Sequence, residues 1–216
     1  MRQLHNPEEG KESYQPNKLK GFEQPRTLNE PHRPAKPTRA ELAEAVHKTV
    51  SDLVRPGLRV LFCGINPGLY TAAIGHHFGR PGNRFWPALY GAGFTSRLLH
   101  PWEERELLEA GLGITNVVPR TTATAAELNA DDYAAGGRRL VATVQHYQPT
   151  VLAVLGVGAY RSAFARKGAT LGLQNETIGA ACIWVLPNPS GLNANYQLVD
   201  LVRLFRELRE WVLITP

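Results

Sequence analysis

The sequence is poor in cysteine, with only Cys63 and Cys182 among its 216 residues. Both stand in short apolar runs, LFC and CIWVL, without a CxxC spacing and without a histidine at ligand spacing. A structural zinc site needs four such ligands. We therefore expect no metal site, and we expect two buried thiols in a reducing compartment.

Long hydrophobic runs are also missing. No stretch of about 18 apolar residues is present, as a membrane-spanning helix would require. The first residues lack the apolar core of a secretory signal. These absences predict a soluble, cytoplasmic protein without a membrane partner.

The charge is modestly positive, because 24 Lys and Arg stand against 19 Asp and Glu. Such a balance leans weakly toward polyanionic partners. Residues 1–40 carry +3 of the net +5, contain six prolines and lack apolar periodicity. We expect a disordered tail there, either merely solvated or adding non-specific affinity for DNA. The folded domain is predicted to span residues 41–216.

Within this domain, short apolar runs alternate with amphipathic segments. Strands are predicted over residues 59–63, 113–118, 150–156 and 181–187. Helices are predicted over residues 41–54, 83–93, 100–111, 131–147, 157–168 and 196–212. This alternation indicates an α/β fold with a mostly parallel sheet covered on both faces. Ligands bind such sheets at the carboxyl ends of the strands.

The loop after the first predicted strand reads Gly64-Ile65-Asn66-Pro67-Gly68-Leu69. Its glycines and proline predict a tight, preset turn whose backbone N–H groups can face a ligand. Asn66 would then stand at the mouth of the sheet. Two interpretations are open: Asn66 hydrogen-bonds its own turn, or it serves a ligand.

A second loop follows the last predicted strand and reads PNPSGLN over residues 187–193. Two prolines stiffen it, and Gly191 allows it to bend. Leu192 either folds back into the core, as most leucines do, or is presented as a wedge that enters a base stack.

The segment GHHFGRPGNRFW, residues 75–86, follows the first loop. His76 and His77 lack a third metal ligand nearby in sequence. Phe78 lies in a glycine-bounded loop, where it either stacks on a base or packs ordinarily.

Together these motifs resemble the mismatch-specific uracil-DNA and thymine-DNA glycosylase family. GINPGL and NPSGL match its two signature motifs, and GHHFGRPGNRFW, GITNVVPRTT and YAAGGRRL match further segments. The resemblance covers residues 57–212. It implies a three-layer α/β/α fold with a short, mostly parallel central sheet. It also implies an enzyme that acts on double-stranded DNA and hydrolyses the N-glycosidic bond of a base mispaired with guanine. That base is uracil, or thymine or another damaged pyrimidine.

The resemblance assigns roles to individual residues and implies that no cofactor is needed. Asn66 matches the catalytic asparagine that positions water. The base-binding matches are Ile65, Thr71, Phe78 and Asn116. The matches to the DNA-intercalating loop are Ser190, Gly191 and Leu192. Gly64, Pro67, Gly68, His77 and Asn188 complete the loops. Bacterial members often carry Arg two residues after the leucine, where this chain has Ala194, so the preference for the opposing base stays open.

Two rival functions differ in chemistry. A nucleoside hydrolase usually relies on paired carboxylates, and neither loop contains Asp or Glu. A non-catalytic module that binds damaged DNA on the same fold stays open, because a fold alone does not fix function.

Overall fold

The computed structural model describes residues 32–215 of the chain. The disorder expected for the tail falls largely on residues 1–31 and lies outside the described residues. Residues 32–38 have no regular secondary structure. The domain boundary near residue 40 stays a prediction.

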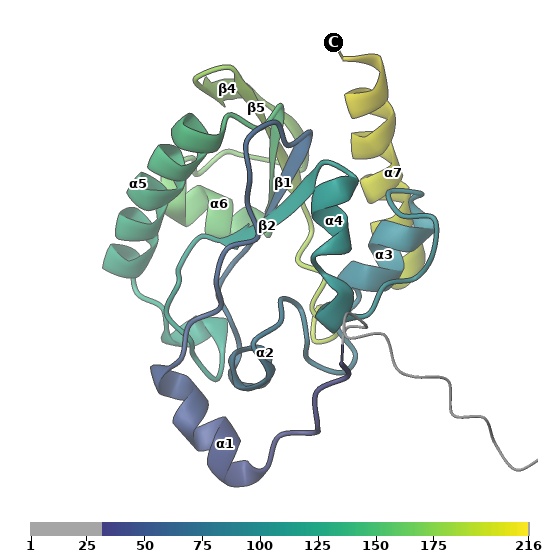
Figure 1. Ribbon diagram of the computed structural model, residues 1–216. Helices are drawn as coiled ribbons and strands as arrows, with labels where there is room; N and C mark the ends of the chain where they lie inside the picture. Colours follow the sequence, from purple (N-terminus) through teal and green to yellow (C-terminus); the bar gives the residue numbers. More distant parts are fainter. Residues whose placement is uncertain (1–31, 216) are drawn as a thin grey trace, which may run out of the picture. The chain divides into compact units, whose positions relative to one another are not determined.

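A five-stranded sheet forms the centre of the domain (Figure 1). Its order is β2-β1-β3-β5-β4. Neighbours among β2, β1, β3 and β5 pair in parallel, and only the edge strand β4 is antiparallel. The strands are β1 (Val60–Gly64), β2 (Leu112–Asn116), β3 (Val151–Leu155), β4 (Gly172–Ile178) and β5 (Ala181–Leu186). The prediction of a short, mostly parallel sheet is confirmed.

Helices cover both faces of the sheet (Figure 1). Side chains alternate along β1, so Phe62 packs in a cluster with Phe85 and Phe205, whereas Leu61 packs in a cluster with Tyr160. The first cluster lies under α3 (Phe85–Gly91), α4 (Glu106–Glu109) and α7 (Leu198–Ile214), and the second lies under α5 (Ala130–Tyr147) and α6 (Val157–Phe164). The three-layer α/β/α fold is therefore confirmed.

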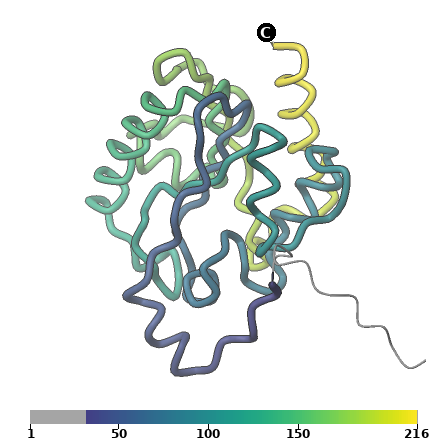
Figure 2. The backbone as a smooth tube through the Cα atoms, in the orientation of Figure 1, coloured from purple at the N-terminus to yellow at the C-terminus, as the bar shows by residue number. Residues whose placement is uncertain are grey.

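The helix predicted over residues 41–54 is wrong in extent. Helix α1 spans only Arg39–Glu44 and continues as a 3-10 turn, Ala45–His47. The chain then extends along the outer edge of β2, where Leu53 exchanges two backbone hydrogen bonds with Ile114, of 2.8 and 2.9 Å. Figure 2 follows this segment from α1 to the start of β1. Pairing of the exposed strand edge outweighs the helical pattern.

Other elements differ in detail. The helix predicted over residues 100–111 is split into a 3-10 turn, Pro101–Glu103, and α4. Strand β4 was not predicted, because its sequence GLQNETI is an edge strand with half its side chains exposed and no apolar run. Helix α2 (Leu69–Ile74) was also missed, since its six residues lie between Gly68 and Gly75 in a glycine-rich stretch.

Helices α5 and α6 cross closely at a glycine, which gives a stability prediction. A Cβ on Gly137 would stand 2.2 Å from the backbone oxygen of Ala163. We expect Gly137→Ala to lower the free energy of unfolding by about 1–3 kcal/mol, the usual range for overpacking. Gly158→Ala in α6 is the matched control, since nothing lies within 4 Å of its Cβ. It should be neutral or stabilise by up to about 1 kcal/mol. Urea denaturation measures both free energies of unfolding, and equal effects of Gly137→Ala and Gly158→Ala would contradict this packing.

Candidate active site

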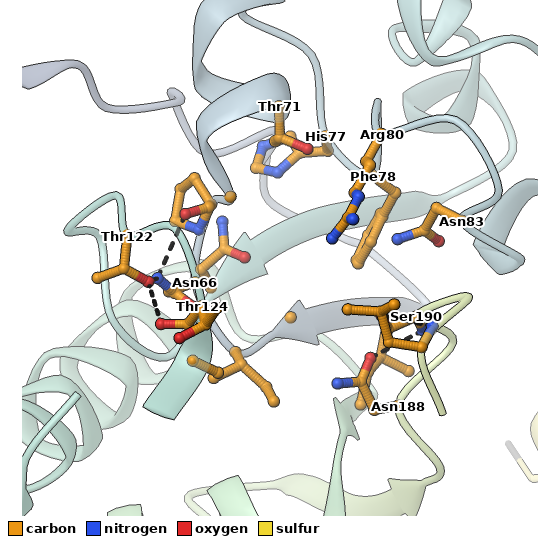
Figure 3. A pocket seen from close by; sticks show the side chains of 18 of the residues that line it. Asn66, Thr71, His77, Phe78, Arg80, Asn83, Thr122, Thr124, Asn188 and Ser190 are labelled. Carbon is orange, nitrogen blue, oxygen red and sulfur yellow. Dashed lines mark hydrogen bonds between the residues drawn. The ribbon is translucent and has the colours of Figure 1, made fainter. Parts of the chain in front are cut away.

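A cleft of about 370 Å³ opens where the parallel strands end. The chain leaves β1 for β2 on one side, and β3 lies on the other side of β1, so the cleft stands at the switch point of the sheet. We call it the main cleft; Figure 3 shows its side chains. Of the thirteen residues assigned from sequence, twelve line it: Gly64, Ile65, Asn66, Pro67, Gly68, Thr71, His77, Phe78, Asn116, Asn188, Ser190 and Leu192.

Asn66 is held by its amide nitrogen. Nδ2 donates to Thr122 Oγ1 at 2.7 Å, to the Arg120 carbonyl at 3.0 Å and to the Pro67 carbonyl at 3.2 Å. Side-chain Oδ1 has no hydrogen-bond partner within residues 32–215. Asn66 therefore does brace the loops around it, and its acceptor oxygen stays free for a ligand or water.

The floor of the main cleft is formed by Gly64 at the end of β1 and Asn116 at the end of β2, which are register partners. A Cβ on Gly64 would stand 2.6 Å from Asn116 Oδ1 and 3.3 Å from the Phe78 ring. Asn116 is 5% exposed, and its side-chain amide makes no hydrogen bond to the described chain. A glycine is thus required where these two side chains approach, and a free amide faces the space above it.

Phe78 forms one wall. Its ring stacks on Phe85 with centroids 4.0 Å apart, which fixes the ring against the core. Its backbone φ is +52°, a left-handed conformation that is uncommon for a bulky residue. Packing against α3 holds this conformation, and the ring is presented to the cleft rather than hidden in the core.

The 188–193 loop forms the opposite rim. Asn188 Oδ1 accepts from Ser190 N at 2.9 Å, and Asn193 Nδ2 donates to the Asn188 carbonyl at 2.9 Å. Ser190 Oγ accepts from Leu192 N at 3.3 Å. Leu192 itself is 72% exposed, so it is not a core residue. A rigid loop thus presents an apolar side chain to solvent at the edge of the main cleft.

A family model described as "Uracil DNA glycosylase superfamily" matches residues 51–212, well over half of the chain. The chain belongs to this superfamily. The match includes both loops of the main cleft and every strand of the sheet. The protein is therefore a DNA glycosylase, a hydrolase of DNA repair that acts on uracil, and DNA is its partner.

His77 is 1% exposed and lies at the inner end of the cleft of this glycosylase. Its Nε2 stands 3.0 Å from the Ser51 carbonyl, which can only accept, so Nε2 carries the proton. Burial lowers the pKa of His77 below its ordinary value, although Glu104 opposes the shift. The ring is therefore neutral near pH 7, and its Nδ1 is an acceptor. Glu104 binds the backbone N–H of His77 at 2.8 Å and His76 Nδ1 at 3.0 Å.

Sequence reasoning missed Thr122, which is 1% exposed. Its hydroxyl donates to the Thr124 carbonyl at 2.8 Å and accepts from Asn66. Because the donated proton is committed to Thr124, the hydroxyl must present its oxygen to Asn66. The available signal was the position of PRTTAT directly after a predicted strand, at the same edge of the sheet as Asn66.

Arg84 was missed as well. Its guanidinium donates to the Tyr196 carbonyl at 2.6 Å, to the Asn193 carbonyl at 2.9 Å and to the Ser190 carbonyl. Its backbone N–H donates to Pro189 at 2.9 Å. A Cβ on Gly191 would stand 2.5 Å from the Gly82 carbonyl, which explains why the loop needs glycine there. Arg84 thus joins the Phe78 segment to the loop that carries Leu192.

The remaining expectations concern thiols, metals and membranes. Cys63 is buried, and burial raises the pKa of its thiol, whereas Cys182 is only half-buried, unlike the prediction. Within residues 32–215 no three His, Cys, Asp or Glu side chains gather closely enough to hold a metal ion. No helix in this range has both the length and the apolar content to cross a membrane.

The role of Thr122 can be tested with two substitutions. Thr122→Val keeps the shape but removes the acceptor for Asn66, so the amide loses one of its three fixed contacts. We expect the single-turnover rate of uracil excision to fall by about 10-fold, as for the loss of one hydrogen bond. Thr122→Ser retains the hydroxyl and should keep the wild-type rate to within about 2-fold. Equal rates for both variants would show that Thr122 does not position Asn66.

Proposed function

We propose that this glycosylase removes uracil mispaired with guanine from duplex DNA, with thymine and other damaged pyrimidines as further candidate bases. In the proposed reaction the nucleotide flips into the main cleft, and water held by Asn66 attacks C1′ of the sugar. The observation that carries this proposal is the commitment of Asn66 Nδ2 to three protein acceptors, which leaves Oδ1 free.

The base would lie between the Phe78 ring and the 64–68 loop. The free amide of Asn116 has a donor and an acceptor side by side, which complements the alternating carbonyl and N–H groups of a pyrimidine edge. His77, as a neutral acceptor, and Thr71 border the same cleft. Stacking and hydrogen bonding together would hold a pyrimidine that has left the helix.

The chemistry would rest on positioning. No Asp or Glu among residues 32–215 lines the main cleft. The neutral Asn66 is not a base, so it can only orient water. The glycosidic bond breaks as the base leaves with negative charge, and water adds to the electron-poor C1′. The proton that the added water loses passes to the departed base or to solvent. Fixed donors near the departing base stabilise that charge. No lysine of the described chain lines this cleft either. Without a Schiff base the enzyme would be monofunctional and leave the strand intact.

Preference for mismatches would follow from the energy of flipping. Removing a base from the stack costs a few kcal/mol, and less when the pair is already weakened, as in G·U or G·T. Leu192 would fill the gap left behind. Because positioned water supplies only modest catalysis, the weakness of the pair would dominate the choice of substrate.

A substrate panel tests the proposed reaction. Labelled duplexes with G·U, A·U and G·T pairs, and single-stranded uracil DNA, are incubated with enzyme and then treated with alkali. Among the three duplexes, the proposal expects G·U to be cut fastest, with strand breaks only after alkali. Breaks without alkali would contradict the monofunctional reaction, and equal rates for G·U and A·U would contradict mismatch preference.

Asn66 is the first residue to test. Asn66→Ala should fold, still bind a G·U duplex and lose at least ~10²-fold in single-turnover excision rate. Asn66→Asp should retain activity that rises with pH through the titration of the new carboxylate, because only the ionised form can take a proton from water. Its negative charge near the departing base opposes full activity.

The outcomes separate the rival interpretations. Loss of stability, binding and catalysis together in Asn66→Ala would mean that the residue only braces the loops. Full activity with saturating enzyme would remove Asn66 from the reaction. Binding of G·U duplex by wild type without any excision would favour a non-catalytic module that binds damaged DNA.

Leu192 gives an independent prediction. Leu192→Ala should leave the melting temperature unchanged, since the side chain is 72% exposed, and should slow excision from duplex by about 10-fold, corresponding to part of the flipping energy. Excision from single-stranded DNA should be nearly unaffected. Val199→Ala is the matched control, because Val199 is 74% exposed on α7 and is not among the residues that line the main cleft. An equal fall in excision rate on duplex and on single-stranded DNA would contradict the insertion of Leu192 into the base stack.

A further inference from the structure

A second cleft, of about 560 Å³, adjoins the main cleft. Phe78, Arg80 and Asn83 line both, so this short segment forms the wall between them. We call the second space the side cleft. Its other walls come from residues 33–36, from α2 and α3, and from residues 98–102. A ligand in the main cleft therefore lies next to the side cleft, with Phe78 between the two.

Aromatic rings are abundant in the side cleft. His100 and Trp102 stack with centroids 4.5 Å apart and planes inclined by 8°, and Arg33 lies 5.8 Å from the centre of the Trp102 ring. Tyr70 and Trp86 also line the space. Flat apolar faces of this kind stack readily on nucleobases of any sequence.

The charge in the side cleft has one sign. Arg33, Lys36 and Arg80 line it, and no Asp or Glu of the described residues does. None of these three cations forms a salt bridge to a carboxylate within the described residues. Unpaired cations beside aromatic rings are the arrangement that binds single-stranded nucleic acid, where the phosphates follow the cations and the bases stack.

Trp86 adds an unsatisfied donor. It is 4% exposed, and its buried indole Nε1–H has no hydrogen-bond partner in the part of the chain that the structure describes. Buried donors are nearly always paired, and leaving one unpaired is unfavourable. A carbonyl oxygen of a base or an oxygen of a phosphate is the kind of acceptor that would satisfy it.

From these observations we propose that the side cleft binds an unpaired nucleotide next to the flipped one on the same strand. The inference rests on the proposed function, since it takes the main cleft as the site of the target base. It predicts that the enzyme holds two consecutive nucleotides of a single strand, one on each side of Phe78. Uracil in frayed or single-stranded DNA would then gain affinity from a stackable neighbour.

The test uses the full chain and fluorescein-labelled single-stranded pentamers with a central 2′-fluoro-deoxyuridine, a nucleotide that resists excision. Three further pentamers carry a tetrahydrofuran abasic site at the centre, at the 5′ neighbour or at the 3′ neighbour. Fluorescence anisotropy gives each Kd. We expect the abasic site at one neighbour, but not at the other, to weaken binding by about 5-fold or more, the lower end for one base–aromatic stack.

Substitutions then locate the effect. Trp102→Ala should abolish the difference between the intact pentamer and the sensitive abasic pentamer. Trp86→Phe removes the N–H together with the five-membered ring of the indole and should weaken binding of the intact pentamer. Tyr90→Ala is the control, because Tyr90 is an exposed aromatic on α3 that lines neither cleft. Melting temperatures show whether each variant folds, and the comparison of pentamers on wild type stands without any variant.

The outcomes separate this inference from the proposed function. If the central base matters and neither neighbour does, the side cleft proposal is overturned while the main cleft stands. If the central base does not matter, the assignment of the main cleft fails. If Trp102→Ala weakens all four pentamers by the same factor, the residue supports the fold and the side cleft proposal is wrong.

Discussion

Everything proposed for the main cleft depends on the hydrogen bonds that fix the amide of Asn66. An amide that could rotate would offer either a donor or an acceptor to water. In this protein the Thr122 hydroxyl and the Arg120 carbonyl accept from Nδ2, so the acceptor oxygen has one direction. These partners lie in the loop after β2, and they reach Asn66 because β1 and β2 are parallel neighbours that end together at Gly64 and Asn116. The sheet topology therefore sets the orientation of a single side chain.

The parts of the fold that could be predicted from sequence are those governed by local pattern. VLFC and VLAVL are short continuous apolar runs of the kind found in strands covered on both faces, and they form β1 and β3. The segment after His47 could not be predicted, because its helical pattern competes with pairing of Leu53 to Ile114, sixty residues away. The same limit applies to the site. Asn66 and Phe78 are marked by glycine-rich loops, whereas Thr122 and Arg84 act through partners from other elements and have no local signature.

Arg84 links two groups that glycosylase chemistry would need at the same moment. The segment around it carries Phe78, which would stack on the flipped base, and its guanidinium holds three carbonyls of the loop that presents Leu192. Among residues 32–215, neutral acceptors and no carboxylate contact this half-buried cation, and its Nε has no hydrogen-bond partner. That is an unfavourable environment for a charge. The other nitrogens of Arg84 donate to the three carbonyls, and these hydrogen bonds join the Phe78 segment to the loop that carries Leu192.

A main cleft that holds no carboxylate from the described residues suits an apolar side chain at its rim. A glycosylase with a strong base could cleave uracil wherever it entered the cleft, and its selectivity would then depend on contacts with the base alone. Here no carboxylate from residues 32–215 lines the main cleft. The chemistry proposed for it is slow, so a base must stay extrahelical for longer to be cut. The residence time outside the helix is longest where re-pairing is weakest and the gap is filled. Discrimination would therefore come from the DNA as much as from the protein. Leu192 would set how long a weakened pair stays open, and the excision rate supported by Asn66 would set how long the base has to remain outside the helix to be cut.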